Sequence, residues 1–183
     1  MPPYPSPWLA LPVLTLCAPL PTALSIEYLD LDQVQHLAFP AAVSFTPCVL
    51  EPTPEQRALI ERRLGAPLGA RMPAVRAARS ADRLLGYLVT DSVIGKHLAI
   101  DYALALTPAR TIQQVEIMSY RESYGGEVHG AAWRAQFTGK GADATLALND
   151  DIASIGGATL SCRHLTEGIK RLLVVCATCL PAP

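Results

Sequence analysis

The chain has 183 residues, a formal net charge of −1 and a half-apolar composition, so it can enclose the core of one domain. Its basic residues are scattered along the sequence, which argues against a nucleic-acid partner. Five cysteines are too few for a disulfide scaffold at this length, and the one Cys-x-x-Cys, Cys176 to Cys179, has no second pair to complete a metal site.

Residues 1–25 are apolar and interrupted by prolines. Ala23 and Ser25 place small residues at the spacing that suits cleavage of a secretory signal before Ile26. We therefore expect a signal peptide or an uncleaved anchor, and a mature chain in the periplasm or on the extracytoplasmic face of a membrane. A buried N-terminal segment is the alternative, and the prolines argue against a stable membrane-spanning helix.

A helix is predicted within residues 26–39, after a short edge strand. Asp30 or Asp32 can cap this helix, and Val34 and Leu37 are spaced to face inward. The proline that follows directly ends the helix.

A second helix is predicted after a short apolar strand at residues 43–50. Thr53 to Gln56 reads as a capping box with proline at the first helical position, and Gly65 ends the helix. Residues 65–80 are rich in Ala, Pro and Arg and show no clear period, so we expect an irregular connection there.

From Leu84 the hydrophobic pattern has a period of two, which is typical of strands. One strand covers residues 84–89, a longer one covers residues 98–106, and a third begins at Ile112. In the long strand large apolar residues alternate with mostly small ones, so small side chains are expected on its exposed or ligand-facing side. The pattern predicts an antiparallel β-sheet meander flanked by helices, which is the α+β class.

A long C-terminal helix is predicted from apolar residues at helical spacing, which are Leu165, Ile169, Leu172, Leu173 and Cys176. These residues fall at i, i+4, i+7, i+8 and i+11, so they form one stripe along the helix. We expect this stripe to face the core of the domain.

Two glycines, Gly156 and Gly157, precede this helix and are followed by the hydroxyls of Thr159 and Ser161. Ser161 is of a residue type that caps helices. A helix N-terminus beside glycines is also a ready site for a phosphate group. On the residues alone, an ordinary capped helix start and a phosphate site both stay open.

A second group of residues follows the third strand of the meander. Glu122 and Tyr124 precede a glycine pair, Gly125-Gly126, and Trp133 and the run Gln136 to Lys140 come after it. By themselves these residues fit a glycine loop beside an aromatic core helix.

Taken together, the two groups resemble the FMN-binding domain family, which includes the covalent-FMN subunits of the sodium-translocating NADH:quinone oxidoreductase and of the Rnf complex. The family pattern runs from a Val-Glu-x strand end through a Glu-x-x-Gly-x-Gly loop and Gln-Phe-x-Gly-Lys to Ser-Gly-Ala-Thr. Val115-Glu116-Ile117 and Gly157-Ala158-Thr159 occupy the first and last places here. The resemblance is specific over residues 84–173 and loose over residues 26–80.

The resemblance implies FMN joined to the side-chain oxygen of Thr159 by a phosphoester bond, with a flavin transferase needed for maturation. It implies an exported electron-transfer protein with a membrane-bound redox partner rather than an enzyme with its own substrate. The helix N-terminus and Lys140 or Arg163 would balance the charge of the phosphodiester. The residues expected at the cofactor are Gly157, Ala158, Thr159, Leu160, Ser161, Glu122, Tyr124, Gly125, Gly126, Phe137 and Lys140.

The expectations divide the chain into a signal peptide or anchor at 1–25, an N-terminal helical segment at 26–80, an FMN-binding domain at 81–176 and a tail at 177–183. Gly95-Lys96-His97, at the start of the long strand, and the other dispersed histidines are assigned no role, and no catalytic or metal-binding residue is predicted. The chain departs from the family at Ala153, where an aspartate is usual. Two further hypotheses therefore stay open, which are a non-redox binding or structural module that has lost flavin attachment, and a reductase with loosely bound FMN.

Overall fold

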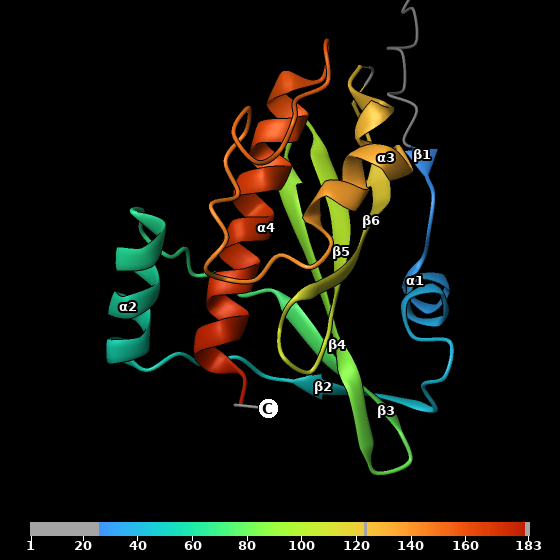
Figure 1. Ribbon diagram of the computed structural model, residues 1–183, viewed down its shortest axis with the longest axis vertical. Coiled ribbons are helices and arrows are strands. Elements are labelled where there is room, and N and C mark those ends of the chain that lie inside the picture. The colour runs from blue at the N-terminus through green and yellow to red at the C-terminus, as the bar shows by residue number, and fades with distance from the viewer. Residues whose placement is uncertain (1–25, 123, 182–183) are drawn as a thin grey trace, which may run out of the picture.

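The computed structural model describes residues 26–122 and 124–181, and the expected signal peptide or anchor lies outside them. The described residues form an antiparallel sheet of six strands flanked by helices, which confirms the predicted α+β class (Figure 1). The order of strands across the sheet is β1-β6-β5-β4-β3-β2. The strands are β1 (Ile26–Glu27), β2 (Ser44–Cys48), β3 (Ala74–Ser80), β4 (Arg83–Ile94), β5 (Ala99–Leu106) and β6 (Ile112–Tyr120).

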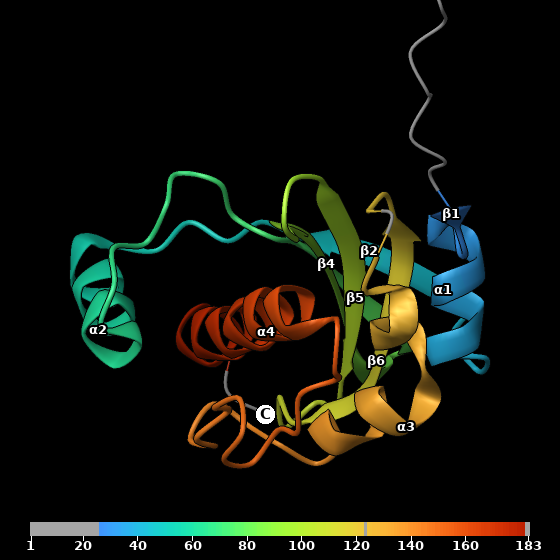
Figure 2. The ribbon, with the colours of Figure 1, turned by 90° about the horizontal axis from the view of Figure 1, so that it is seen from above.

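Helices cover both faces of the sheet (Figure 2). The long helix α4 (Thr159–Cys179) packs on one face, and α1 (Leu31–Ala38) lies on the other. The helix α2 (Pro54–Leu64) lies beside α4, where the Gln56 side chain donates to the Thr178 carbonyl over 3.1 Å. Short helical turns follow β6, namely η1 (Gly126–His129), α3 (Ala131–Arg134) and η2 (Ala135–Phe137). Among the described helices, none has the length and apolar character that crossing a bilayer requires.

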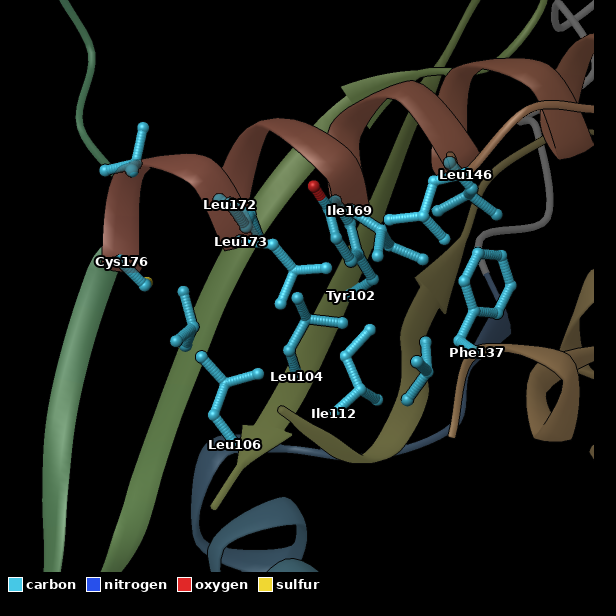
Figure 3. Packing of buried hydrophobic residues seen from close by; sticks show 14 of the residues in the cluster. Tyr102, Leu104, Leu106, Ile112, Phe137, Leu146, Ile169, Leu172, Leu173 and Cys176 are labelled. Carbon is cyan, nitrogen blue, oxygen red and sulfur yellow. The ribbon is translucent and has the colours of Figure 1, made fainter. Parts of the chain in front are cut away.

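The main core lies between α4 and strands β4 to β6 (Figure 3). The predicted apolar stripe of α4 is wholly inaccessible to solvent, which confirms the expected inward face of this helix. Large side chains of β5 and the first residue of β6 meet that stripe from below. The side chains in contact include Tyr102, Leu104, Leu106, Ile112, Leu165, Ile169, Leu172, Leu173 and Cys176.

A smaller core lies on the opposite face of the sheet, and it corrects the expectation that the small-residue face of the long strand is exposed or faces a ligand. Ala103 and Ala105 of β5 are 1% and 2% exposed, because Val34 and Phe39 cover them. Small side chains let this helix and the ring after it approach the sheet closely. Leu37, which was predicted to face inward, is instead 49% exposed.

Local signals placed the ends of α1 and α2 correctly. Asp30 caps α1 and Thr53 caps α2, each in a capping box with a glutamine three residues later, and Gly65 ends α2 in the left-handed conformation. The irregular connection expected at residues 65–80 is wrong in its second half, since Ala74–Ser80 is strand β3. That strand pairs with both β2 and β4, so neighbouring strands supply the order that its composition does not predict.

Candidate functional site

A pocket of about 570 Å³ opens at the N-terminus of α4, beside the end of β6 and the hairpin between β4 and β5. This volume lies within the range that small-molecule and cofactor sites occupy. Residues from three segments that are distant in sequence line it. They are Lys96, His97, Glu122, Tyr124, Gly157, Thr159, Leu160 and Ser161.

The first turn of α4 presents backbone N–H groups to this pocket. The helix begins at Thr159 with Ala158 as its N-cap, and no side chain caps it. Cys162 donates to the Ala158 carbonyl over 2.9 Å, so the N–H groups of Thr159, Leu160 and Ser161 have no acceptor within the helix. The exposed Thr159 therefore stands, within the described residues, among N–H donors that have no acceptor in the helix, at the positive end of a helix dipole.

Ser161 does not cap the helix, which corrects the interpretation drawn from its residue type. The helix begins two residues earlier, so Ser161 occupies its third position and is only 4% exposed. Its Oγ lies 2.9 Å from the hydroxyl of Tyr120, which donates over 2.5 Å to the Tyr124 carbonyl. The hydrogen bond between Ser161 and Tyr120 therefore links α4 to the segment that follows β6. Burial raises the pKa of the Tyr120 hydroxyl, and the hydrogen bond with Ser161 offsets part of that shift.

The glycine loop after β6 lies against the start of α4, as the motif order predicts. Gly125 has a φ of +90°, and a Cβ atom there would stand 2.6 Å from the Tyr120 hydroxyl and 3.1 Å from Ser161 Oγ. Only glycine accepts both this backbone conformation and this close approach. A Cβ atom at Gly126 would stand 3.8 Å from the Tyr120 ring and from the Tyr28 hydroxyl, so this glycine faces those side chains and not Thr159.

The hairpin between β4 and β5 forms the third wall of the pocket. One carboxylate oxygen of Glu122 accepts from the backbone N–H groups of His97 and Leu98, the latter over 2.7 Å. His164 of α4 holds the other side, where its Nδ1 donates to the carbonyls of Ile94 and Gly95 over 2.7 and 2.8 Å. Partial burial acts to raise the pKa of Glu122, but the hydrogen bonds from these N–H groups outweigh it and hold that pKa below its usual range.

Lys96 and His97 are therefore site residues that sequence reasoning missed. Both are exposed and line the pocket that Thr159 enters. The available signal was Gly95-Lys96-His97, a glycine turn that carries a cation between two strands. Hydrogen bonds with Glu122 and His164 hold this turn beside α4. Both residues are far from the turn in sequence, so no local pattern predicts these bonds.

Two predicted cofactor residues, Phe137 and Lys140, do not line the pocket, and Lys140 lies at the opposite end of β6. Ile112, the first residue of that strand, donates to the Lys140 carbonyl over 2.8 Å. The ammonium of Lys140 is paired with Asp151 over 2.9 Å, and Phe137 is fully buried in the main core (Figure 3). The structure thus does not bring either residue to the pocket, and it is Lys96 rather than Lys140 that lies beside Thr159.

The motif at that far end instead holds the loop that leads to Thr159. Trp133 Nε1 donates to the Ala153 carbonyl over 2.8 Å, and Gln136 Oε1 accepts from the Ala153 N–H over 2.7 Å. Asp151 accepts from the Ala147 N–H over 2.7 Å as well as from Lys140. These bonds fix the backbone on the approach to the glycine turn, so the position of Thr159 depends on residues that do not line the pocket.

The donor set at the pocket suits an anionic group with a flat apolar body. The N–H groups with no acceptor in the helix and Lys96 supply positive potential, and the exposed Tyr124 and Leu160 offer apolar surface beside them. Residues 95–174 match the family described as the FMN-binding domain. Over this segment the chain is similar to FMN-binding domains. The pocket residues from Lys96 to Ser161 all fall within it, and FMN is the ligand that the match supports.

A curated relative is the G subunit of the proton-translocating ferredoxin:NAD(+) oxidoreductase complex of Clostridium ljungdahlii. It is 29% identical to this chain over 101 residues, which cover 51% of the chain and 55% of the relative. The match thus spans about half the length of that protein.

Proposed function

We propose that this chain is an electron-transfer flavoprotein that carries FMN covalently on Thr159. The observation that supports the proposal best is the position of the Thr159 hydroxyl. It is exposed at the first position of α4, inside the FMN-binding segment, among backbone N–H groups with no acceptor in the helix. Bound FMN supplies reversible electron transfer, and the Clostridium ljungdahlii relative is named as part of an oxidoreductase complex.

The attachment step is a phosphoryl transfer with no change in oxidation state. The Thr159 oxygen attacks the flavin-side phosphorus of FAD, the bond from that phosphorus to the bridging oxygen breaks, AMP leaves, and the hydroxyl proton passes to solvent. A flavin transferase with Mg²⁺ would supply the catalytic groups, since the pocket itself contributes only binding groups. The product keeps one negative charge, which the N-terminus of α4 and Lys96 are positioned to balance.

Partners and location complete the proposal. We assign the domain to the extracytoplasmic face of a membrane, where it exchanges electrons with a membrane-bound redox partner. The support is the apolar segment at residues 1–25 and the complex to which the relative belongs by name. Fractionation of cells that express the tagged chain tests the location, and recovery of the intact protein in the cytoplasm contradicts it.

The test of attachment is the intact mass after incubation with FAD, Mg²⁺ and a flavin transferase. The wild type should gain one FMN less one water, and its denatured band should fluoresce. Thr159→Ala should show neither signal because a methyl group offers no oxygen, while Thr159→Ser keeps a nucleophile and should label partly. Thr138→Ala, at another exposed threonine of the same segment, is the matched control and should label fully. Labelling of Thr159→Ala would show that the acceptor lies elsewhere.

A non-redox module that keeps the fold is the second candidate, and Ala153 is the observation that favours it. The backbone of Ala153 is held by Trp133 and Gln136, while its side chain position is exposed, so an aspartate there would extend from the surface. A flavin transferase that reads this carboxylate would not recognise the present chain. If the wild type stays unlabelled and Ala153→Asp becomes labelled, the second candidate is the correct one.

A further inference from the structure

Exposed apolar side chains occur in the wall of the Thr159 pocket and in the hairpin whose turn forms part of that wall. Tyr124 and Leu160 line the pocket, and Ile94 and Leu98 stand on either side of the turn whose Lys96 enters it. We call Ile94, Leu98, Tyr124 and Leu160 the pocket rim, and they are 59, 38, 86 and 41% exposed. Apolar side chains gathered around a site, rather than scattered singly, mark a surface that contacts an apolar partner.

The charge-free N-terminal segment joins the molecule at the same end. Ile26 of β1 pairs with Tyr120, the last residue of β6 and a neighbour of Ser161 in the pocket wall. The 25 residues before Ile26 contain no Asp, Glu, Lys, Arg or His. Figure 1 shows β1 near the same end of the molecule as the start of α4 and the β4–β5 hairpin, while β2 lies at the other end.

We propose that the pocket rim inserts into the surface of a lipid bilayer, with residues 1–25 entering the same membrane beside it. A groove on another protein would bind the pocket rim but not the charge-free segment. A bilayer can bind both, because both are apolar. The rim side chains come from a hairpin, a loop and a helix turn, so they would enter the interface as separate apolar anchors. This inference goes beyond the proposed function and does not depend on flavin attachment.

The consequence is a fixed orientation of the domain. With the pocket rim in the interface, the Thr159 pocket opens toward the membrane surface, and the end of the molecule that carries β2 points away from it. A group held in the pocket would thus stand at the level of the lipid headgroups, where a membrane-embedded electron carrier could approach it.

The test is vesicle partitioning of the full, unflavinylated chain. Vesicles of phosphatidylcholine with phosphatidylglycerol are sedimented with the wild type, with Ile94→Gln/Leu98→Gln, and with Val43→Gln/Val49→Gln. The control pair is 74% and 80% exposed and flanks β2 at the opposite end, so it removes exposed apolar side chains elsewhere that are more accessible than the rim pair. Ile94 and Leu98 do not line the pocket, so the rim variant leaves the flavin contacts in place.

The rim variant should lower the partition coefficient on the order of tenfold, and the control should change it by less than about twofold. Binding of the wild type should persist at high salt, because burial of apolar surface is not screened by ions. An unchanged partition coefficient in the rim variant, or an equal loss in the control, overturns the proposal and leaves residues 1–25 as the whole membrane contact.

Hydroxyl-radical footprinting distinguishes the other occupants of the rim. Leu98 and Tyr124 should be oxidised in solution and protected only when vesicles are added. Protection of the wild type without vesicles, in a sample that is monomeric by sedimentation velocity, would show that residues 1–25 fold back on the rim. Protection that rises with protein concentration would show a second copy there. Either result overturns the bilayer as the occupant.

Discussion

The two ends of β6 carry the two halves of the motif pattern, and they differ in burial and in contacts. Near Tyr120, the pocket residues Thr159 and Lys96 are exposed and are placed by backbone and side-chain hydrogen bonds. Near Ile112, Phe137 is inaccessible to solvent and Lys140 is already paired with a carboxylate. The comparison shows that one end of the pattern forms the pocket while the other holds the loop that brings Thr159 into place. Residues that belong to one family pattern therefore need not line the same pocket.

The largest expected effect on stability is at the Ile112 end of β6. Phe137→Ala should lower the free energy of unfolding by about 3–5 kcal/mol, because it leaves a cavity in the main core where the ring packs edge-on against Trp133. Denaturant unfolding measures this. Tyr124→Ala, at an 86% exposed aromatic of the pocket, is the matched control and should change stability by less than about 0.5 kcal/mol. Equal losses in the two variants would remove the distinction between the ends.

A smaller loss should follow from Trp133→Phe, which keeps an aromatic ring in the core but removes the donor to the Ala153 carbonyl. Leaving that bond unmade should cost about 1–3 kcal/mol of unfolding free energy. Hydrogen exchange of the amides in residues 147–157 should rise more than exchange in β4 or β5, because the bond anchors that loop. Unchanged exchange in the loop would show that its position does not depend on Trp133.

The Glu122 carboxylate, at the pocket end of β6, should make the stability of the folded chain depend on pH. Its pKa in the folded chain lies below the ordinary glutamate value of 4.5, so its contribution to stability is present above that pH and is lost as the pH falls through the folded value. Glu122→Gln should lower stability by about 1 kcal/mol at neutral pH, since the carboxylate is partly exposed, and the difference from wild type should vanish in acid. Glu127→Gln, at an exposed acid of the next turn, is the matched control and should change stability at neutral pH by less than about 0.5 kcal/mol.

The smallest expected effect compares the two lysines. Lys96→Ala should weaken binding of free FMN to the unloaded chain by about two- to fivefold, with stability changed by less than about 0.5 kcal/mol. Lys140→Ala should do the reverse, lowering stability by about 0.5–1 kcal/mol through loss of the pair with Asp151 and leaving FMN affinity unchanged. Fluorescence titration measures the FMN affinity of both variants, and denaturant unfolding measures their stability. Weaker FMN binding in Lys140→Ala alone would return that lysine to the site.

The sequence predicted that the glycine loop and the Thr159 turn lie side by side, because the two motifs follow each other in the order of the family pattern. It missed the hairpin that carries Lys96, and it placed Lys140 at the cofactor, because both motifs were assumed to converge on one pocket. The length of β6 separates Lys140 from the pocket, and no local pattern measures that distance.

The sequence by itself determined the elements with strong local signals. The caps at Asp30 and Thr53, the end of α2 at Gly65 and the apolar stripe of α4 depend on bonds and spacings within a few residues, so they could be read directly. Tertiary structure alone decided that Ser161 faces Tyr120 instead of capping its helix. It also decided that β3 is a strand, that β1 pairs with the last strand, and that alanines of β5 lie under α1. These features depend on hydrogen-bond partners and packing surfaces that lie far away along the chain, and the local sequence does not specify which of them a residue will meet.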